Sequence, residues 1–166
     1  MIPRGACLPG IRGVNIPKKS ANPMNKEAES RLAALLPQAH PADLETAAMR
    51  VPTRLPYLLA ARFDYDVRQG GFSQLLYNMR GKLLANIEDM LIAANASVAH
   101  EYYVRAITAC LSNKPEYRRF LASDYTEANE VKHALQMISV DYLSKRVAFS
   151  DEVAAFMAND DCIPEG

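Results

Sequence analysis

The sequence predicts an all-α protein, a compact single-domain bundle of about seven or eight helices. From residue 25 onward, apolar residues recur at the three- and four-residue spacings that are typical of helix faces. No segment of six residues alternates between apolar and polar side chains, as a half-buried strand would. The chain has 166 residues, of which 49% are apolar and 23% charged, so one domain can build its own core.

The composition divides the chain into three parts. Residues 1–24 contain four prolines and three glycines and show no periodicity, which predicts a flexible leader. Five basic and no acidic residues lie in residues 1–26, so the leader is basic and residues 27–166 carry a net charge of −5. We expect a helical domain over 25–159 and a short tail over 160–166. Two alternatives for the leader are a translation start at Met24 and a basic arm for nucleic acid or an acidic partner.

Two short helices are expected at the start of the domain. Asn25 can cap the first of them, and Pro37 ends it. Pro41 suits the first turn of the second helix, which runs to about Met49. Their inward residues would be Ala28, Leu32, Leu35, Leu36, Leu44, Ala47 and Ala48.

A third helix is expected to begin after Thr53, which is suited to N-capping. Two pairs on this helix, Arg62 with Asp66 and Asp64 with Arg68, have the four-residue spacing of ion pairs on a solvated outer face. The apolar stripe of the helix would be Leu55, Leu58, Leu59 and Phe63.

Three further helices and one short segment are expected. Residues 82–95 predict an amphipathic helix, and Ser97 and Ser150 can each cap another helix. A short turn or helix is expected over 117–121. The inward residues of these segments would be Leu83, Leu84, Ile87, Met90, Leu91 and Ala94, then Ala99, Tyr103, Ala106, Ile107 and Cys110, and finally Val153, Phe156 and Met157.

The longest regular repeat lies in a helix expected to start at Asp124. Asp124 and Glu127 have the spacing of a capping box. The apolar positions then repeat with a seven-residue period, which predicts packing along a neighbouring helix of the same chain. A homodimer seam is the alternative. The stripe consists of Ala128, Val131, Leu135, Ile138 and Tyr142.

Residues 70–81 form the most informative segment of the chain. Gly70 or Gly71 can adopt the left-handed conformation that ends the third helix, and Phe72 can seal such a cap. A short helix follows and Gly81 ends it. The amides of Gln74 and Asn78 lie four residues apart on one helix face and can join two chain segments by hydrogen bonds. The pattern predicts a structural corner, with direct contact to a ligand or partner as the alternative.

No catalytic residue, cofactor or metal site is expected. Glu130 and His133 match the Glu-x-x-His spacing of di-iron helices, but the required second copy is missing. The three cysteines are odd in number and widely spaced, which favours a reducing cytoplasm over a disulfide framework. No apolar run is long enough for a membrane helix, and the N-terminus has no apolar run typical of a secretory signal. The net charge of −5 over 27–166 is not that of a nucleic-acid-binding domain.

The segment 70–81 resembles the signature of the bacterial DNA-mimic protein family, an all-α domain. That signature runs Asn-Gly-Gly-Phe-x-Gln, two aromatic residues, x-Asn, two small residues and Gly, followed by an amphipathic helix. This chain departs from it at Gln69, where asparagine is usual, at Leu75 and Leu76, which replace the aromatics, and at 79–80. The resemblance is good over about 53–110 and looser over 27–158. The matching residues are Gly70, Gly71, Phe72, Gln74, Asn78 and Gly81.

The resemblance implies a helical, dimeric protein that acts by binding another protein. Carboxylates arranged like DNA phosphates would attract a DNA-binding protein such as a transcription factor. We therefore expect a non-enzymatic interaction module in the cytoplasm, with neither nucleic acid nor membrane bound directly. The alternative is an enzyme of unrecognised type with a polar pocket near Gln74 and Asn78. The candidate acidic partner surface comprises Asp64, Asp66, Glu88, Asp89, Asp151 and Glu152.

Overall fold

The computed structural model describes residues 23–159, and within them it confirms the all-α prediction. The expected leader up to residue 22 and the expected tail over 160–166 lie outside the described residues. Residues 23–159 form nine α-helices and one 3-10 helix, and seven of the α-helices have seven or more residues. Their bounds are α2 Pro23–Leu35, η1 Leu36–Gln38, α3 Pro41–Arg50, α4 Leu55–Met79, α5 Leu84–Ala93, α6 Ser97–Ser112, α7 Lys114–Ala122, α8 Glu130–Ser144, α9 Phe149–Glu152 and α10 Ala154–Met157.

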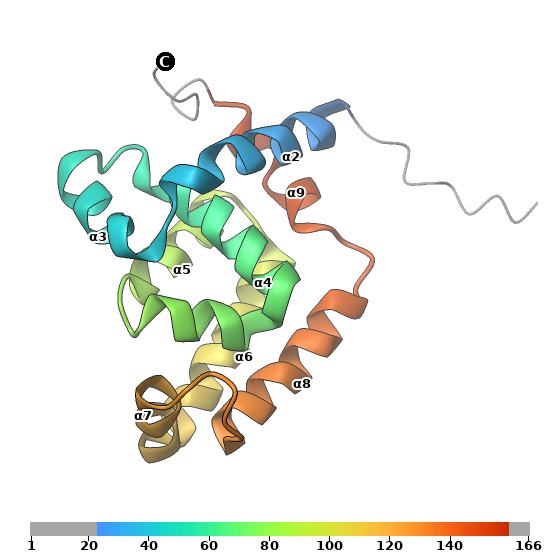
Figure 1. The fold of residues 1–166 in the computed structure, drawn as a ribbon. Coiled ribbons are helices and arrows are strands. Elements are labelled where there is room, and N and C mark those ends of the chain that lie inside the picture. The colour runs from blue at the N-terminus through green and yellow to red at the C-terminus, as the bar shows by residue number, and fades with distance from the viewer. Residues whose placement is uncertain (1–22, 160–166) are drawn as a thin grey trace, which may run out of the picture.

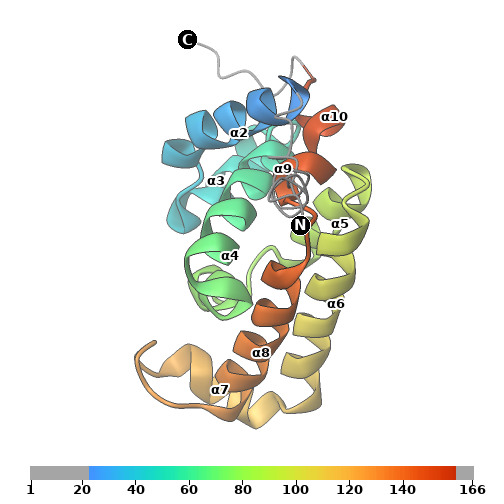
Figure 2. The same ribbon diagram turned by 90° about the vertical axis from the view of Figure 1, so that its right-hand side faces the viewer.

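Helix α4 lies at the centre of the molecule, and the other helices are arranged around it (Figure 1). It contacts α2, α3, α5 and α8. Helix α8 runs beside α6, and α7 closes the end of this pair (Figure 2). At the opposite end α2 packs against α9 and α10, so the first and last described helices lie together.

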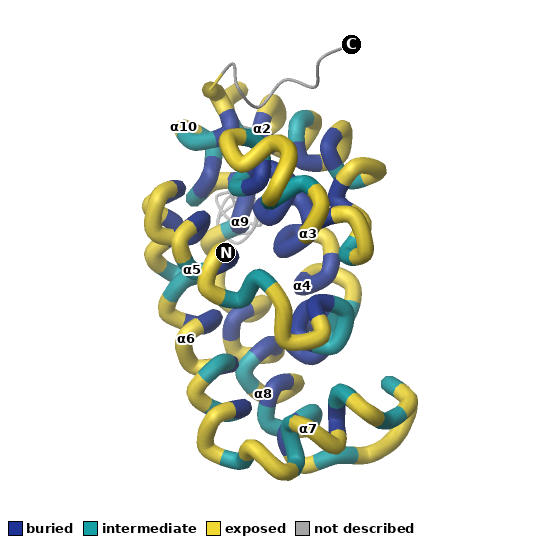
Figure 3. Tube along the Cα trace, turned by 90° about the vertical axis from the view of Figure 1, so that its left-hand side faces the viewer, coloured by how far each residue is buried: buried dark blue, intermediate teal, exposed yellow. Residues whose placement is uncertain are grey.

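The central position of α4 explains its burial. Of its 25 residues, 17 are buried, among them eight in succession over 57–64, and much of α4 is dark blue in Figure 3. Over those two turns the helix has no solvated face to carry charge without a partner. The aromatic core around it includes Phe63, whose ring lies 4.8 Å from that of Phe149 and 6.0 Å from that of Phe72.

Helix α4 is bent at Gly71. The backbone of Gly71 has φ 72° and ψ −166°, a region that is essentially restricted to glycine. The predicted third helix therefore ends at the glycine pair, and the predicted short helix follows at once as a second arm of α4. That arm ends at Arg80, which adopts the left-handed conformation one residue before Gly81.

Serine 139 of α8 lies directly against the bend. The N–H of Phe72 donates a hydrogen bond of 2.8 Å to the Ser139 hydroxyl, which in turn donates one of 2.6 Å to the Leu135 carbonyl. A Cβ atom at Gly71 would lie only 2.4 Å from Ser139 Oγ. The bend thus needs glycine for two independent reasons, its backbone conformation and the close approach of α8.

Five predicted helix starts are wrong. Helix α2 begins before Asn25, and α4 begins two residues after Thr53. Helix α6 begins at Ser97 and α9 one residue before Ser150, whereas α8 begins six residues after Asp124. Asp124 instead closes a local turn, in which its carboxylate accepts a hydrogen bond from the Thr126 N–H. The five residues are Asn25, Thr53, Ser97, Asp124 and Ser150, and none of them is the N-cap of its helix.

Other residues cap the helices instead. The side chain of Asn129 accepts a hydrogen bond of 3.1 Å from the Lys132 N–H and so caps α8. His40 caps α3 in the same way through the Ala42 N–H. Because a cap needs only an acceptor in the right place, several residues near a helix start are equally suited to it on sequence alone.

The predicted stripe of α8 packs within the chain. Val131, Leu135 and Tyr142 are buried where α8 meets α4 and α6, and Ile138 is half-buried there. This stripe is therefore occupied by the chain's own helices and is not a homodimer seam. Ala128 lies before the helix and is exposed.

We expect Gly71→Ala to lower the free energy of unfolding by about 2–5 kcal/mol, because a strained backbone and an overpacked contact add together. Urea denaturation of the purified protein measures this.

Gly81→Ala is the matched control, because Gly81 also has a positive φ of 77° but its nearest neighbour to a new Cβ is 3.9 Å away. It should cost only about 1–2 kcal/mol. Equal losses for the two variants would contradict the contact between Gly71 and Ser139.

Candidate functional site

The two amides of the corner segment take part in a chain of hydrogen bonds. Gln74 Nε2 donates to Asn78 Oδ1 at 3.0 Å, and Asn78 Nδ2 donates to Asp66 Oδ2 at 3.2 Å. Arg62 donates to the other Asp66 oxygen at 2.6 Å and to the Ala39 carbonyl at 3.4 Å. These hydrogen bonds therefore link Ala39, the residue that follows η1, to both arms of α4.

The bend makes this chain of bonds possible. Asp66 and Asn78 are twelve residues apart, which in a straight α-helix would separate them by about 18 Å along the axis. Their direct hydrogen bond requires the second arm of α4 to fold back toward the first. The amides of Gln74 and Asn78 take part in this contact. Neither side chain lines the pocket between α2, α4 and α8 that is described below.

The predicted ion pairs of α4 form, but not on a solvated face. The Arg62–Asp66 contact is 2.6 Å long and the Arg68–Asp64 contact 2.7 Å. Asp66 is only 1% exposed and Asp64 8%, so neither belongs to an exposed acidic surface. Burial raises the pKa of both carboxyls, more than the neighbouring arginines lower it.

Glu152 also has a structural task. Its two carboxylate oxygens accept hydrogen bonds from the N–H groups of Val98 and Ala99, at 2.7 and 3.1 Å. Without Glu152 these N–H groups in the first turn of α6 would have no partner within the helix. A negative charge at this position also complements the helix dipole. Glu152 thus caps a helix that Ser97 was expected to cap.

The remaining predicted acids are accessible. Asp89 is exposed on α5, and its neighbour Glu88 contacts His100 of α6 at 3.1 Å with 45% of its side chain exposed. Glu101 follows on α6 with 58% of its side chain exposed and pairs with Arg105. Asp151 is exposed on α9 and accepts a hydrogen bond from Asn25 of α2.

Charge is nearly balanced over the described residues. Four of the 19 basic residues precede residue 23 and three of the 19 acidic residues follow residue 159. Residues 23–159 therefore hold 15 basic and 16 acidic side chains. Any acidic surface must come from a local group of carboxylates and not from a net charge of the whole domain.

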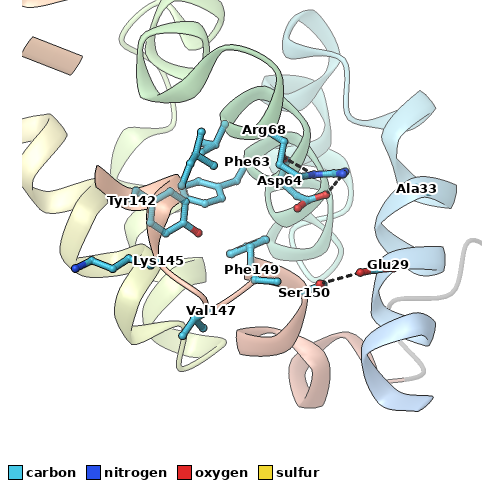
Figure 4. Close-up of a pocket in the computed structure, with 13 residues that line it drawn as sticks. Glu29, Ala33, Phe63, Asp64, Arg68, Tyr142, Lys145, Val147, Phe149 and Ser150 are labelled. Atoms are coloured by element: carbon cyan, nitrogen blue, oxygen red, sulfur yellow. Dashed lines mark hydrogen bonds and ion pairs between the residues drawn. The ribbon is translucent and has the colours of Figure 1, made fainter. Parts of the chain in front are cut away.

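A pocket of about 530 Å³ opens between α2, α4, the end of α8 and residues 145–150 (Figure 4). Phe63, Val67 and Phe149 supply apolar walls, while Asp64 and Tyr142 lie at its buried side. The sequence pattern does not predict this pocket, because its residues come from four separate segments. The burial of Asp64, whose ion pair with Arg68 was expected on a solvated face, points to the pocket, but only the folded structure shows that burial.

The described part of the chain contains neither a group of candidate metal ligands nor an activated cysteine. No three side chains of His, Cys, Asp or Glu in residues 23–159 come together as a metal site. Cys110 is buried and free, and burial raises the pKa of its thiol to about 12, so the reactive thiolate is disfavoured. No helix of residues 23–159 is both long and apolar enough to cross a membrane.

A protein-family model described as DMP19-like protein matches residues 52–159. The match begins just before α4 and ends after α10, so it covers the bend, the buried ion pairs and Glu152. No curated protein and no solved structure matches the chain.

Asp66→Ala should lower the free energy of unfolding by about 3–5 kcal/mol, because it leaves the buried Arg62 guanidinium without its charge partner. Asp89→Ala, at an exposed acid whose side chain has no hydrogen-bond or ion-pair partner among residues 23–159, should change it by less than about 0.5 kcal/mol. Urea denaturation of both variants measures the difference. A mild effect of Asp66→Ala would show that Asp66 is not structural.

Asp64→Asn should become more stable relative to the wild type as the pH rises above 3.8, the unperturbed value for this carboxyl. The raised pKa means that folded wild-type protein holds the proton more tightly than unfolded protein does. Wild-type stability therefore falls as the pH rises from 3.8 to the folded pKa, and the amide lacks this loss. Urea denaturation at a series of pH values measures it, and an advantage that shrinks with rising pH would contradict it.

Proposed function

Because the chain belongs to the DMP19-like protein family, we propose that it is a non-enzymatic module that binds a DNA-binding protein. The family match covers residues 52–159 and is the observation that carries the proposal. A transcription factor is the kind of partner this proposal implies. The cytoplasm is the compartment in which such a partner would be met.

Accessible carboxylates of α5 and of the beginning of α6 support a partner surface there. Glu88 contacts the first turn of α6 through His100, and Glu101 is the next residue of α6. Asp89 lies next to Glu88 in the exposed part of α5. We call Glu88, Asp89 and Glu101 the α5–α6 acidic group, and Asp151 is a further exposed acid on α9.

The physical basis of the proposal is the response of DNA-binding proteins to spaced negative charge. Their basic surfaces are built to meet rows of phosphates, and a local group of exposed carboxylates offers a similar field. Charges at an exposed surface mainly speed up association and select the partner. Binding of this kind weakens as salt screens the charges.

The non-enzymatic part of the proposal is supported by the use of the motif side chains. The amides of Gln74 and Asn78 bond to each other and to Asp66, and neither side chain lines the pocket between α2, α4 and α8. The family signature is thus better explained as a way to bend α4 than as a reactive site.

The experiment is affinity capture of a partner from the native cell, followed by measurement of its binding to the purified protein and of its release from DNA. We expect Glu88→Lys with Asp89→Lys to weaken that binding by tenfold or more, the loss of about 1.4 kcal/mol, and high salt to weaken the wild-type complex. The partner should leave its DNA when the wild-type protein is added.

Glu45→Lys with Glu127→Lys is the matched control. Both acids are exposed on other parts of the fold, and the change in net charge is the same. Glu45 pairs only with exposed Lys82, a contact of little energetic weight. Equal effects of the two double variants, or a complex that salt does not weaken, would rule out the α5–α6 acidic group as the partner surface.

A further inference from the structure

The pocket between α2, α4 and α8 is rich in hydrogen-bond acceptors. Asp64 Oδ2 accepts from Arg68, whereas Asp64 Oδ1 accepts no hydrogen bond from any described residue. Glu29 Oε1 accepts a hydrogen bond of 3.3 Å from Ser150, which leaves its second oxygen available. Two carboxylates of the pocket wall thus each have an unused oxygen.

The hydroxyl of Tyr142 adds a third polar group. Tyr142 is 5% exposed, and its hydroxyl has no hydrogen-bond partner among residues 23–159. The side chain points into the pocket from α8, across from Asp64 on α4 (Figure 4). A buried hydroxyl without a partner is costly, and its position at a cavity is explained if a ligand completes its bonding.

The pocket wall contains few donors to match these acceptors. The guanidinium of Arg68 is already bonded to Asp64 and is largely exposed. The Lys145 ammonium lies 5.9 Å from the centre of the Tyr102 ring and points away from the cavity (Figure 4). Burial raises the pKa of the Asp64 carboxyl despite Arg68, and the nearby Glu29 carboxylate raises it as well, so a cation beside both carboxylates would stabilise their charged forms.

The remaining walls suit an apolar stem that carries the charge. Phe63 and Phe149 are buried, with ring centres 4.8 Å apart, and Val147 is exposed at the rim. Aromatic rings also attract cations through their faces. A volume of about 530 Å³ lies within the range of small-molecule sites.

We propose that this pocket binds an alkylammonium or alkylguanidinium group, with the charge held by Asp64, Glu29 and Tyr142 and the stem lying against the apolar wall formed by Phe63, Val67 and Phe149. Such a group can come from a free amine or from a lysine or arginine side chain of another protein. The chemistry is the same in both cases. The pocket is separate from the α5–α6 acidic group, so the inference does not depend on the proposed partner surface.

The test is amide NMR of the full chain titrated with n-pentylamine, 1-pentanol and pentanoate, which share a stem and differ in charge. We expect n-pentylamine to shift the signals of Val67, Phe149 and Ser150, with pentanol weaker and pentanoate without effect. Acetylated pentapeptides with a central lysine, arginine or norleucine form the second arm. Binding of the amine alone identifies a free amine as the occupant, and binding of the lysine or arginine peptide identifies a side chain.

Variants test the named groups. Tyr142→Phe removes no hydrogen bond within the described protein, so it should fold as the wild type does and yet bind the cation roughly 2- to 10-fold more weakly. Asp64→Asn should weaken binding by tenfold or more. Tyr117→Phe is the matched control, because the Tyr117 hydroxyl is likewise buried and unpartnered but lies outside the pocket.

The outcomes separate this inference from the proposed function. Glu88→Lys with Asp89→Lys should bind n-pentylamine as the wild type does, whatever happens to the protein partner. The inference is overturned if no cation shifts the pocket signals, if pentanol or pentanoate binds as well as the amine, or if Tyr142→Phe and Tyr117→Phe have equal effects.

Discussion

The contact between Gly71 and Ser139 is the constraint on which the rest of the structure depends. It fixes the bend of α4 against α8, and it gives the Phe72 N–H, which the bend displaces from the helical ladder, a buried acceptor. The bend returns Asn78 to Asp66, and Asp66 holds Arg62, which reaches the Ala39 carbonyl. One backbone conformation therefore determines how the two halves of the domain meet. Without it, the buried carboxylate and guanidinium of α4 would lack part of their bonding.

This dependence changes how the family signature should be understood. Its buried glycine, Gly71, bends the central helix α4, and the half-buried amides of Gln74 and Asn78 supply bonds to a buried ion pair. A signature of this kind marks an architecture, and relatives that share it can present different surfaces to different partners. The partner surface that we propose therefore lies outside the signature, at Glu88 and Asp89 of α5 and Glu101 of α6.

Much of the fold was predictable from local pattern, and the site was not. The helix faces, the turn at Gly71 and the two ion pairs of α4 follow from spacing and backbone preference. The predictions of helix starts failed for two reasons: Glu152 caps α6 from a distant segment, and near α8 the residue Asn129 is as well suited to capping as Asp124. The prediction that Asp64 and Asp66 are exposed failed, because an i,i+4 ion pair has the same sequence pattern whether solvent or another helix covers it. The pocket could not be predicted, since it exists only where four segments converge.

The capping of α6 by Glu152 has a consequence for how the chain reaches its final form. The carboxylate lies 54 residues after the amide of Val98 that it binds. During synthesis, the start of α6 must therefore wait, with its amides bonded only to water, until the last turn of α9 has left the ribosome. Closing so long a loop carries an entropic cost that the final contacts must offset. The C-terminal helices consequently complete the packing of the domain. A nascent chain that ends before them would leave the N–H groups at the start of α6 without their protein acceptor.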